Sequence, residues 1–189
     1  MKREHWWIIG LLVVGIGLFA LVQGVVLPKQ ELREAEYAEA QRDPTTHDVK
    51  RILPYRHPYM GNAANLGNLF DHLPLAHLRR TYQLHPETLT AEINYQAAAS
   101  QVDGPTLYKS LIYNSVAAFA LIGNLEHLRF NFMDAAYVTG RDRMEAVFGR
   151  DLSALLTEET WKTAVQEPLA DPGFVQQTLE AAFTVEGGK

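Results

Sequence analysis

Apolar residues are unevenly distributed along the chain, and the longest apolar run lies near the N-terminus. Between Trp6 and Leu27 the only strongly polar side chain is Gln23. As a helix this run would extend about 33 Å at ~1.5 Å per residue, close to the ~30 Å of bilayer hydrocarbon. It has no polar stripe of the kind shown by helices packed on a soluble core. Residues 6–27 therefore predict a transmembrane anchor that contacts the lipid bilayer.

The residues that flank this run predict its orientation. Residues 1–5 include Lys2 and Arg3, and the positive-inside rule places this N-terminus in the cytoplasm. The alternative is a cleaved signal peptide with a small-residue site at residues 22–24. The run is longer than the usual ~7–15 apolar residues and has no Ala-x-Ala pattern, so a retained single-pass anchor is the favoured interpretation. Both interpretations place the rest of the chain outside the cytoplasm.

A short polar segment, residues 28–47, separates the apolar run from the rest of the chain. Its part from Glu31 to Arg42 is rich in Glu, Ala, Arg and Gln, which are good helix formers. The helix should end at Asp43, because a residue that precedes proline disfavours the helical conformation. We therefore expect a short helical stalk or linker.

Shorter periodic patterns follow in residues 48–184. Alternating residues within 82–85 and 89–95 predict two strands joined by a short turn. The segment 106–122 predicts a helix whose apolar end is buried at the centre of the domain. The remaining expected elements are a short helix after Asn62, strands over 128–132 and 137–138, and helices that begin near residues 139, 157 and 172. Residues 185–189 should form a frayed tail.

This order of elements predicts an α+β domain: a small, mostly antiparallel sheet covered by helices. One transmembrane helix and a short helical stalk should precede it.

Composition excludes several kinds of chemistry. The 189 residues include no cysteine, which removes disulfides and thiol nucleophiles. Acidic residues outnumber basic ones by 22 to 17, and no basic run is present, so we expect no nucleic-acid partner. The seven histidines show none of the three- or four-residue spacings that place two imidazoles on one helix face. The sequence predicts no catalytic residue, no metal site and no cofactor.

One segment, residues 53–68, has an unusual polar and aromatic composition. Its polar groups are costly to bury unless they are hydrogen-bonded. In one interpretation the asparagines cap and line a helix while the tyrosines pack. In the other the segment forms a recognition surface for a peptide, a glycan or a partner domain. The candidate binding residues are Tyr55, His57, Tyr59, Asn62, Asn65 and Asn68.

Several stretches of the chain together resemble a known family. They are the run HPYMGNAANLGNLFDHLPL at residues 57–75, the expected strand at 89–95, and the run NSVAAFALIGN at 114–124 that leads into the strand at 128–132. Over roughly residues 48–155 the chain resembles the bacterial domain-of-unknown-function family 4825. The resemblance implies a membrane segment or lipoprotein signal followed by a domain outside Gram-positive cells. It implies no activity, ligand or catalytic residue.

These observations lead to a hypothesis with two alternatives. The favoured one is a non-catalytic, membrane-tethered module that binds a protein or ligand of the cell envelope, as an accessory or sensor subunit. The first alternative is an enzyme that acts on the envelope, with His57 and Tyr59 as part of its only polar cluster. The second is a structural subunit of a membrane complex, with Ala20 and Gly24 at a helix-packing spacing.

Overall fold

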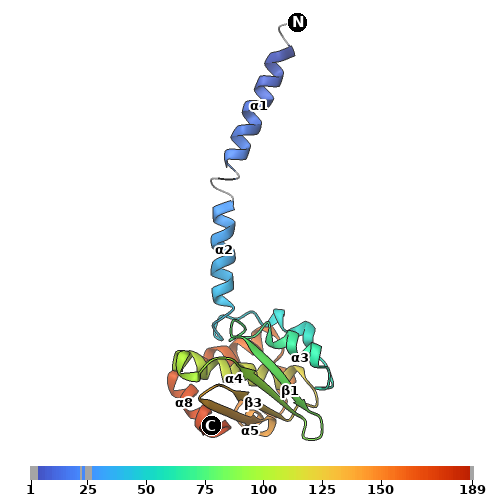
Figure 1. Cartoon of the computed structure of the whole chain (residues 1–189), viewed down its shortest axis with the longest axis vertical. Coiled ribbons are helices and arrows are strands. Elements are labelled where there is room, and N and C mark those ends of the chain that lie inside the picture. The colour runs from blue at the N-terminus through green and yellow to red at the C-terminus, as the bar shows by residue number, and fades with distance from the viewer. Residues whose placement is uncertain (1–3, 22, 24–26, 188–189) are drawn as a thin grey trace. The chain divides into compact units, whose positions relative to one another are not determined.

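The computed structural model describes residues 4–21, 23 and 27–187 (Figure 1). The chain divides into two compact units, residues 1–40 and 41–189, which are described separately here. The first unit contains helices α1, Glu4–Leu21, and α2, Leu27–Ala40. Helix α2 includes most of the expected helical segment of the stalk, which its Glu- and Ala-rich composition favours.

The predicted transmembrane helix over residues 6–27 needs correction. No helix in the described part of the chain is both long enough and apolar enough to cross a membrane. Helix α1 ends at Leu21 and its first turn contains Glu4, so its apolar part extends only about 24 Å at ~1.5 Å per residue. Residues 22 and 24–26 of the predicted span, like residues 1–3 of the predicted cytoplasmic segment, lie outside the described residues.

The second unit is built on one five-stranded sheet whose strands lie side by side in chain order. Three of the four neighbouring pairs are antiparallel, and β2 and β3 are parallel. The strands are β1 (Arg80–His85), β2 (Thr90–Tyr95), β3 (His127–Asn131), β4 (Ala135–Gly140) and β5 (Phe183–Gly187).

The sheet is therefore mixed, and the prediction of a mostly antiparallel sheet was wrong. Residues 96–126, which join β2 to β3, contain the long helix α4, Gly104–Leu121. A helical connection of this length brings the chain back from the end of β2 to the edge of the sheet at which β2 begins. Strand β3 therefore starts beside the first residue of β2 and runs in the same direction. The predicted tail was also wrong in part, because residues 183–187 form edge strand β5 against β4. Residues 188–189 lie outside the described residues.

Helix α4 is the centre of the core, as its apolar pattern predicted. It begins after Asp103, whose carboxylate accepts a hydrogen bond from Thr106 N at 3.2 Å, with Pro105 in the first turn. Thirteen of its residues are buried. Alternate strand residues such as Ile93 and Phe130, which pair across β2 and β3, are also fully buried. The other face of the sheet therefore carries most of the polar residues of β1, β2, β3 and β5, whereas β4 contributes Ala136, Val138 and Gly140 to it.

Shorter helices surround this core. Helix α3 follows its cap residue Asn62, as predicted, and α8 packs against α4. The helical stretch 158–169 has a π-helical middle just before Pro168, which cannot donate a backbone hydrogen bond. The bounds are η2 Val49–Arg51, η3 Leu53–Tyr55, α3 Ala63–Phe70, η4 Ala99–Gln101, α5 Arg141–Phe148, η5 Leu152–Leu155, α6 Glu158–Trp161, η6 Lys162–Gln166, α7 Glu167–Leu169 and α8 Pro172–Ala182.

Candidate functional site

Four of the six predicted binding residues take part in local contacts around α3. The Asn62 side chain accepts a hydrogen bond from Asn65 N at 3.1 Å and so caps the helix. The Asn65 side chain in turn donates to Tyr55 O at 2.8 Å. The Tyr55 hydroxyl lies 3.3 Å from His72 Nε2, and the backbone oxygen of Asn68 lies 2.8 Å from His72 Nδ1. These contacts fix the path of the chain into and along the helix.

The other two, His57 and Tyr59, lie on the extended segment before α3. Their ring centroids are 6.2 Å apart, and Tyr59 N donates to His57 Nδ1 at 3.0 Å. The backbone of His57 forms a parallel bridge with Ile122, just past the end of α4. Tyr59 is 65% exposed. The structure thus separates the six residues into a helix-capping group and a pair beside the end of α4.

His57 lines a cavity of about 540 Å³ at this end of α4. The lining also contains four charged residues: Arg56 from the same extended segment, Arg141 and Glu145 from α5, and Asp151 from the turn before η5. Arg141, Glu145 and Asp151 were not predicted from the sequence, because they lie outside the segment of unusual composition. Only the fold brings them to His57.

The most extensive polar arrangement is on the solvent-facing side of the sheet. The register of β1, β2 and β3 aligns polar residues in three rows: Thr81, Asn94 and Asn131; Gln83, Glu92 and Arg129; His85, Thr90 and His127. All nine are exposed or half-buried. We call these nine residues, with Glu186 of β5, the polar sheet face.

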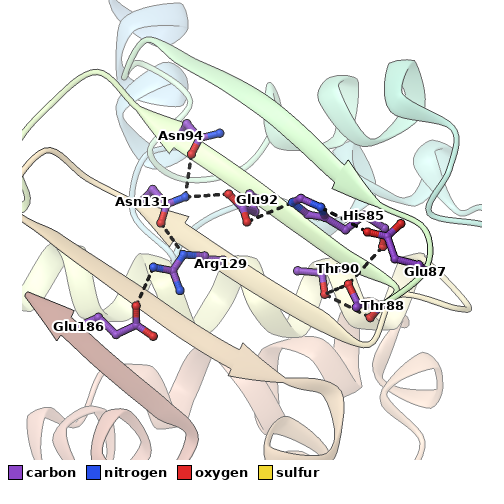
Figure 2. A network of polar contacts seen from close by, with 9 residues as sticks. All are labelled: His85, Glu87, Thr88, Thr90, Glu92, Asn94, Arg129, Asn131 and Glu186. Atoms are coloured by element: carbon purple, nitrogen blue, oxygen red, sulfur yellow. Dashed lines mark hydrogen bonds and ion pairs between the residues drawn. The ribbon is translucent and has the colours of Figure 1, made fainter. Parts of the chain in front are cut away.

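Hydrogen bonds connect this face from one side of the sheet to the other (Figure 2). Asn131 Nδ2 donates to Asn94 Oδ1 at 2.7 Å and to Glu92 Oε2 at 3.1 Å. The other Glu92 oxygen lies 3.1 Å from His85 Nε2. Arg129 Nε donates to Asn131 Oδ1 at 2.8 Å, and Arg129 Nη2 donates to Glu186 Oε2 at 2.7 Å. The side chains therefore hold one another in fixed orientations.

Two ends of this network differ in their electrostatics. The hydrogen bond from Arg129 lowers the pKa of Glu186, and the same contact raises the pKa of Arg129. Both groups stay charged near neutral pH. At the other end, His85 has carboxylates on both ring nitrogens, Glu92 at 3.1 Å and Glu87 at 3.6 Å. The face thus presents fixed charges of both signs around two central amides.

A second polar cluster is fully buried and has a structural role. His47 Nε2 lies 2.6 Å from the backbone oxygen of His72, and His47 Nδ1 lies 2.7 Å from the Tyr113 hydroxyl. Trp161 Nε1 donates to that hydroxyl at 3.0 Å. Burial lowers the pKa of His47 to about 4. Among the described residues no group of three His, Asp or Glu side chains is placed to hold a metal ion.

Comparison with known families identifies the central part of the chain. Residues 52–142 match the family described as Domain of unknown function (DUF4825). This segment is a DUF4825 domain. The DUF4825 segment contains strands β1–β4 and helix α4, and with them the whole polar sheet face except Glu186. No curated protein and no solved structure matches the chain.

Proposed function

We propose that this protein is a non-catalytic binding module of the cell envelope whose polar sheet face contacts a partner protein. The observation that carries the proposal is the pair Asn94 and Asn131, directly opposite each other on the neighbouring strands β2 and β3. Asparagine is depleted in strands, so two at this position do not serve the stability of the sheet. Their mutual hydrogen bond fixes both amides toward solvent on a half-exposed face.

The open hydrogen-bonding capacity of this face suits a protein surface. Within the described residues, the amide nitrogen of Asn94 donates no hydrogen bond, and each Glu92 oxygen accepts one. Arg129, held by Asn131 and Glu186, supplies a fixed guanidinium of the kind enriched at binding hot spots. Because these side chains are already ordered, little conformational entropy is lost when a partner binds.

Helix α1 supports a location at a membrane. Its described apolar side chains are 58–79% exposed, including Trp6, Leu12 and Phe19. Exposed apolar area on this scale is stabilised by contact with lipid. We therefore include in the proposal that α1 contacts the bilayer and keeps the domain at the outer surface of the membrane.

Flotation of the full-length protein with lipid vesicles tests the membrane contact. The double variant L12K/F19K places two charges on exposed α1 positions, and we expect it to lose most of the vesicle-bound fraction. The control is Leu32→Lys, which puts one such charge at a position of α2 that is 63% exposed, and it should float as the wild type does. Equal flotation of the double variant and the wild type would contradict a lipid contact through α1.

Photocrosslinking in intact cells tests the binding surface. A photoreactive side chain at Gln83, an exposed position of the polar sheet face, should give a discrete product with a partner protein. The same group at Glu180, exposed on α8, is the control and should not. N94A/N131A should reduce the Gln83 product several-fold. Identical products from both positions, or an undiminished product in the double variant, would overturn the proposal.

A further inference from the structure

The cavity at the end of α4 is lined by charged groups of both signs, and several of their polar atoms have no hydrogen-bond partner among the described residues. Arg141 Nη1 is 3.8 Å from Glu145 Oε1, which is too long for a hydrogen bond. Within the described residues, the Glu145 carboxylate accepts no hydrogen bond and the Arg56 guanidinium donates none. Asp151 Oδ1 accepts hydrogen bonds from Ser153, from the backbone N at 3.0 Å and the hydroxyl at 2.7 Å, while Oδ2 accepts none from the part of the chain that the structure describes.

The two cations are held in different ways. Arg141 is fixed: Nε donates to Leu125 O at 2.9 Å, Nη2 donates to Ile122 O at 2.8 Å, and the guanidinium stacks on Phe119 at 5.4 Å. Its remaining nitrogen, Nη1, is left for another acceptor. Arg56 is exposed on the rim of the cavity. The cavity therefore offers one rigid and one adaptable donor for a carboxylate.

The two carboxylates offer the complementary acceptors. The contact with Ser153 lowers the pKa of Asp151, and Arg56 lowers it further, so this group is ionised at neutral pH. Glu145 is half-buried beside Arg141. With two guanidinium groups and two carboxylates the charge of the lining is balanced. A ligand of one charge would gain contacts with one pair and meet repulsion from the other, whereas a ligand with both charges can satisfy all four groups.

We propose that this cavity binds a small zwitterion, a molecule with one ammonium and one carboxylate group, such as an amino acid or a short peptide with free termini. The carboxylate binds between Arg56 and Arg141 Nη1, and the ammonium group lies against Glu145 and Asp151. The volume of about 540 Å³ is within the range of roughly 300–1,000 Å³ typical of small-ligand sites. The proposal is independent of the polar sheet face, which involves other residues.

Isothermal titration calorimetry of the full-length protein in detergent tests this site, with L-alanyl-L-alanine as the probe. The dipeptide should bind, and N-acetylation or C-terminal amidation should each weaken binding at least tenfold. Titration with L-alanine as a second probe distinguishes a site for free amino acids from a site for short peptides. Equal affinity for alanine and dialanine identifies an amino-acid site, and tighter binding of dialanine identifies a peptide site; both outcomes support the proposal.

Matched variants assign each end of the ligand. Arg56→Gln should weaken dialanine binding about tenfold and reduce the difference between dialanine and its amide, because the variant lacks one of the two carboxylate donors. Glu145→Gln should likewise remove most of the difference between dialanine and its N-acetyl form. The controls Arg150→Gln and Glu159→Gln remove the same charges from exposed positions outside the lining and should bind as the wild type does.

Three results would overturn the proposal. The first is the absence of binding by both dialanine and alanine in a wild-type protein whose circular dichroism shows the native fold. The second is equal binding of dialanine, its N-acetyl form and its amide. The third is loss of binding in the control variants to the same extent as in Arg56→Gln. If Arg56→Gln unfolds the protein, Arg56→Lys replaces it, and undiminished discrimination against the amide is then expected.

Discussion

Burial of His47 makes the stability of the domain sensitive to mild acid. The side chain is 2% exposed, and both of its ring nitrogens have partners. Because the backbone oxygen of His72 can only accept, His47 Nε2 carries the hydrogen and Nδ1 accepts from the Tyr113 hydroxyl. The Tyr113 oxygen in turn accepts from Trp161. A proton added to His47 Nδ1 would point at the hydroxyl hydrogen of Tyr113, so this hydrogen bond would be lost and an unpaired charge would be buried in the core.

The magnitude and sign follow from the pKa. Burial lowers the pKa of His47 from 6.5 to about 4 in the folded state. Between these values the unfolded chain binds one proton more than the folded chain, so the folded state loses stability as the pH falls. The free energy of unfolding should therefore drop by about 2 kcal/mol from pH 7 to pH 5. At pH 4 the loss should be about 3 kcal/mol, and the full effect is reached only below the folded-state pKa.

Urea denaturation of the full-length protein, followed by circular dichroism at several pH values between 7 and 5, measures this slope. His47→Gln keeps a donor and an acceptor at the site but cannot titrate, so its free energy of unfolding should be nearly independent of pH in this range. The matched control is His127→Gln, an exposed histidine of the sheet, which should keep the wild-type slope. A flat wild-type profile, or an unchanged slope in His47→Gln, would refute the reasoning.

Two further predictions use paired substitutions. Asn114→Ala removes a buried side-chain donor that binds a backbone oxygen at 2.8 Å, and it should lower the free energy of unfolding in urea by about 1–3 kcal/mol. Ser110→Ala removes a buried hydroxyl that has no hydrogen-bond partner among the described residues, and it should be neutral or stabilising. Gly123→Ala would place a Cβ 3.0 Å from Pro58 O and should lower the free energy of unfolding by about 1–3 kcal/mol. Gly61→Ala adds a Cβ in open space and should change the free energy of unfolding by less than about 0.5 kcal/mol. Equal effects of the two glycine variants would contradict the close approach of Gly123 to Pro58.

The local features of the fold were predictable from sequence because they depend on neighbouring residues. The Asn62 cap and the Asp103 cap are both present, since a short polar side chain before a helix satisfies a free backbone N–H. The burial of α4 followed from an apolar segment without a polar stripe. Strand β5 was missed because its alternation is limited to Phe183 and Val185, too short a pattern to distinguish from a tail.

The direction of strand pairing was not encoded in any local pattern. Alternation identified strands near β2 and β3 but cannot tell parallel from antiparallel neighbours. The sequence signal that favours a parallel crossover is the long helix between the two strands, which is not part of either strand pattern. The residues of the candidate sites differ in the same way. Asn62 and Asn65 form hydrogen bonds with residues close to them in the chain, whereas Arg141 and Asp151 are brought to the cavity only by the tertiary fold.

The crossover through α4 produces both proposed surfaces. Because it makes β2 and β3 parallel neighbours, Asn94 lies directly opposite Asn131, which is distant from it in the chain. Helix α4 of the same crossover ends just before Ile122, where the backbone of His57 forms a bridge and Arg141 donates to the Ile122 carbonyl. The element that the sequence analysis assigned to the core alone thus also positions the polar sheet face and the charged cavity. Substitutions within α4 should accordingly affect both surfaces, whereas substitutions at either surface should leave the other intact.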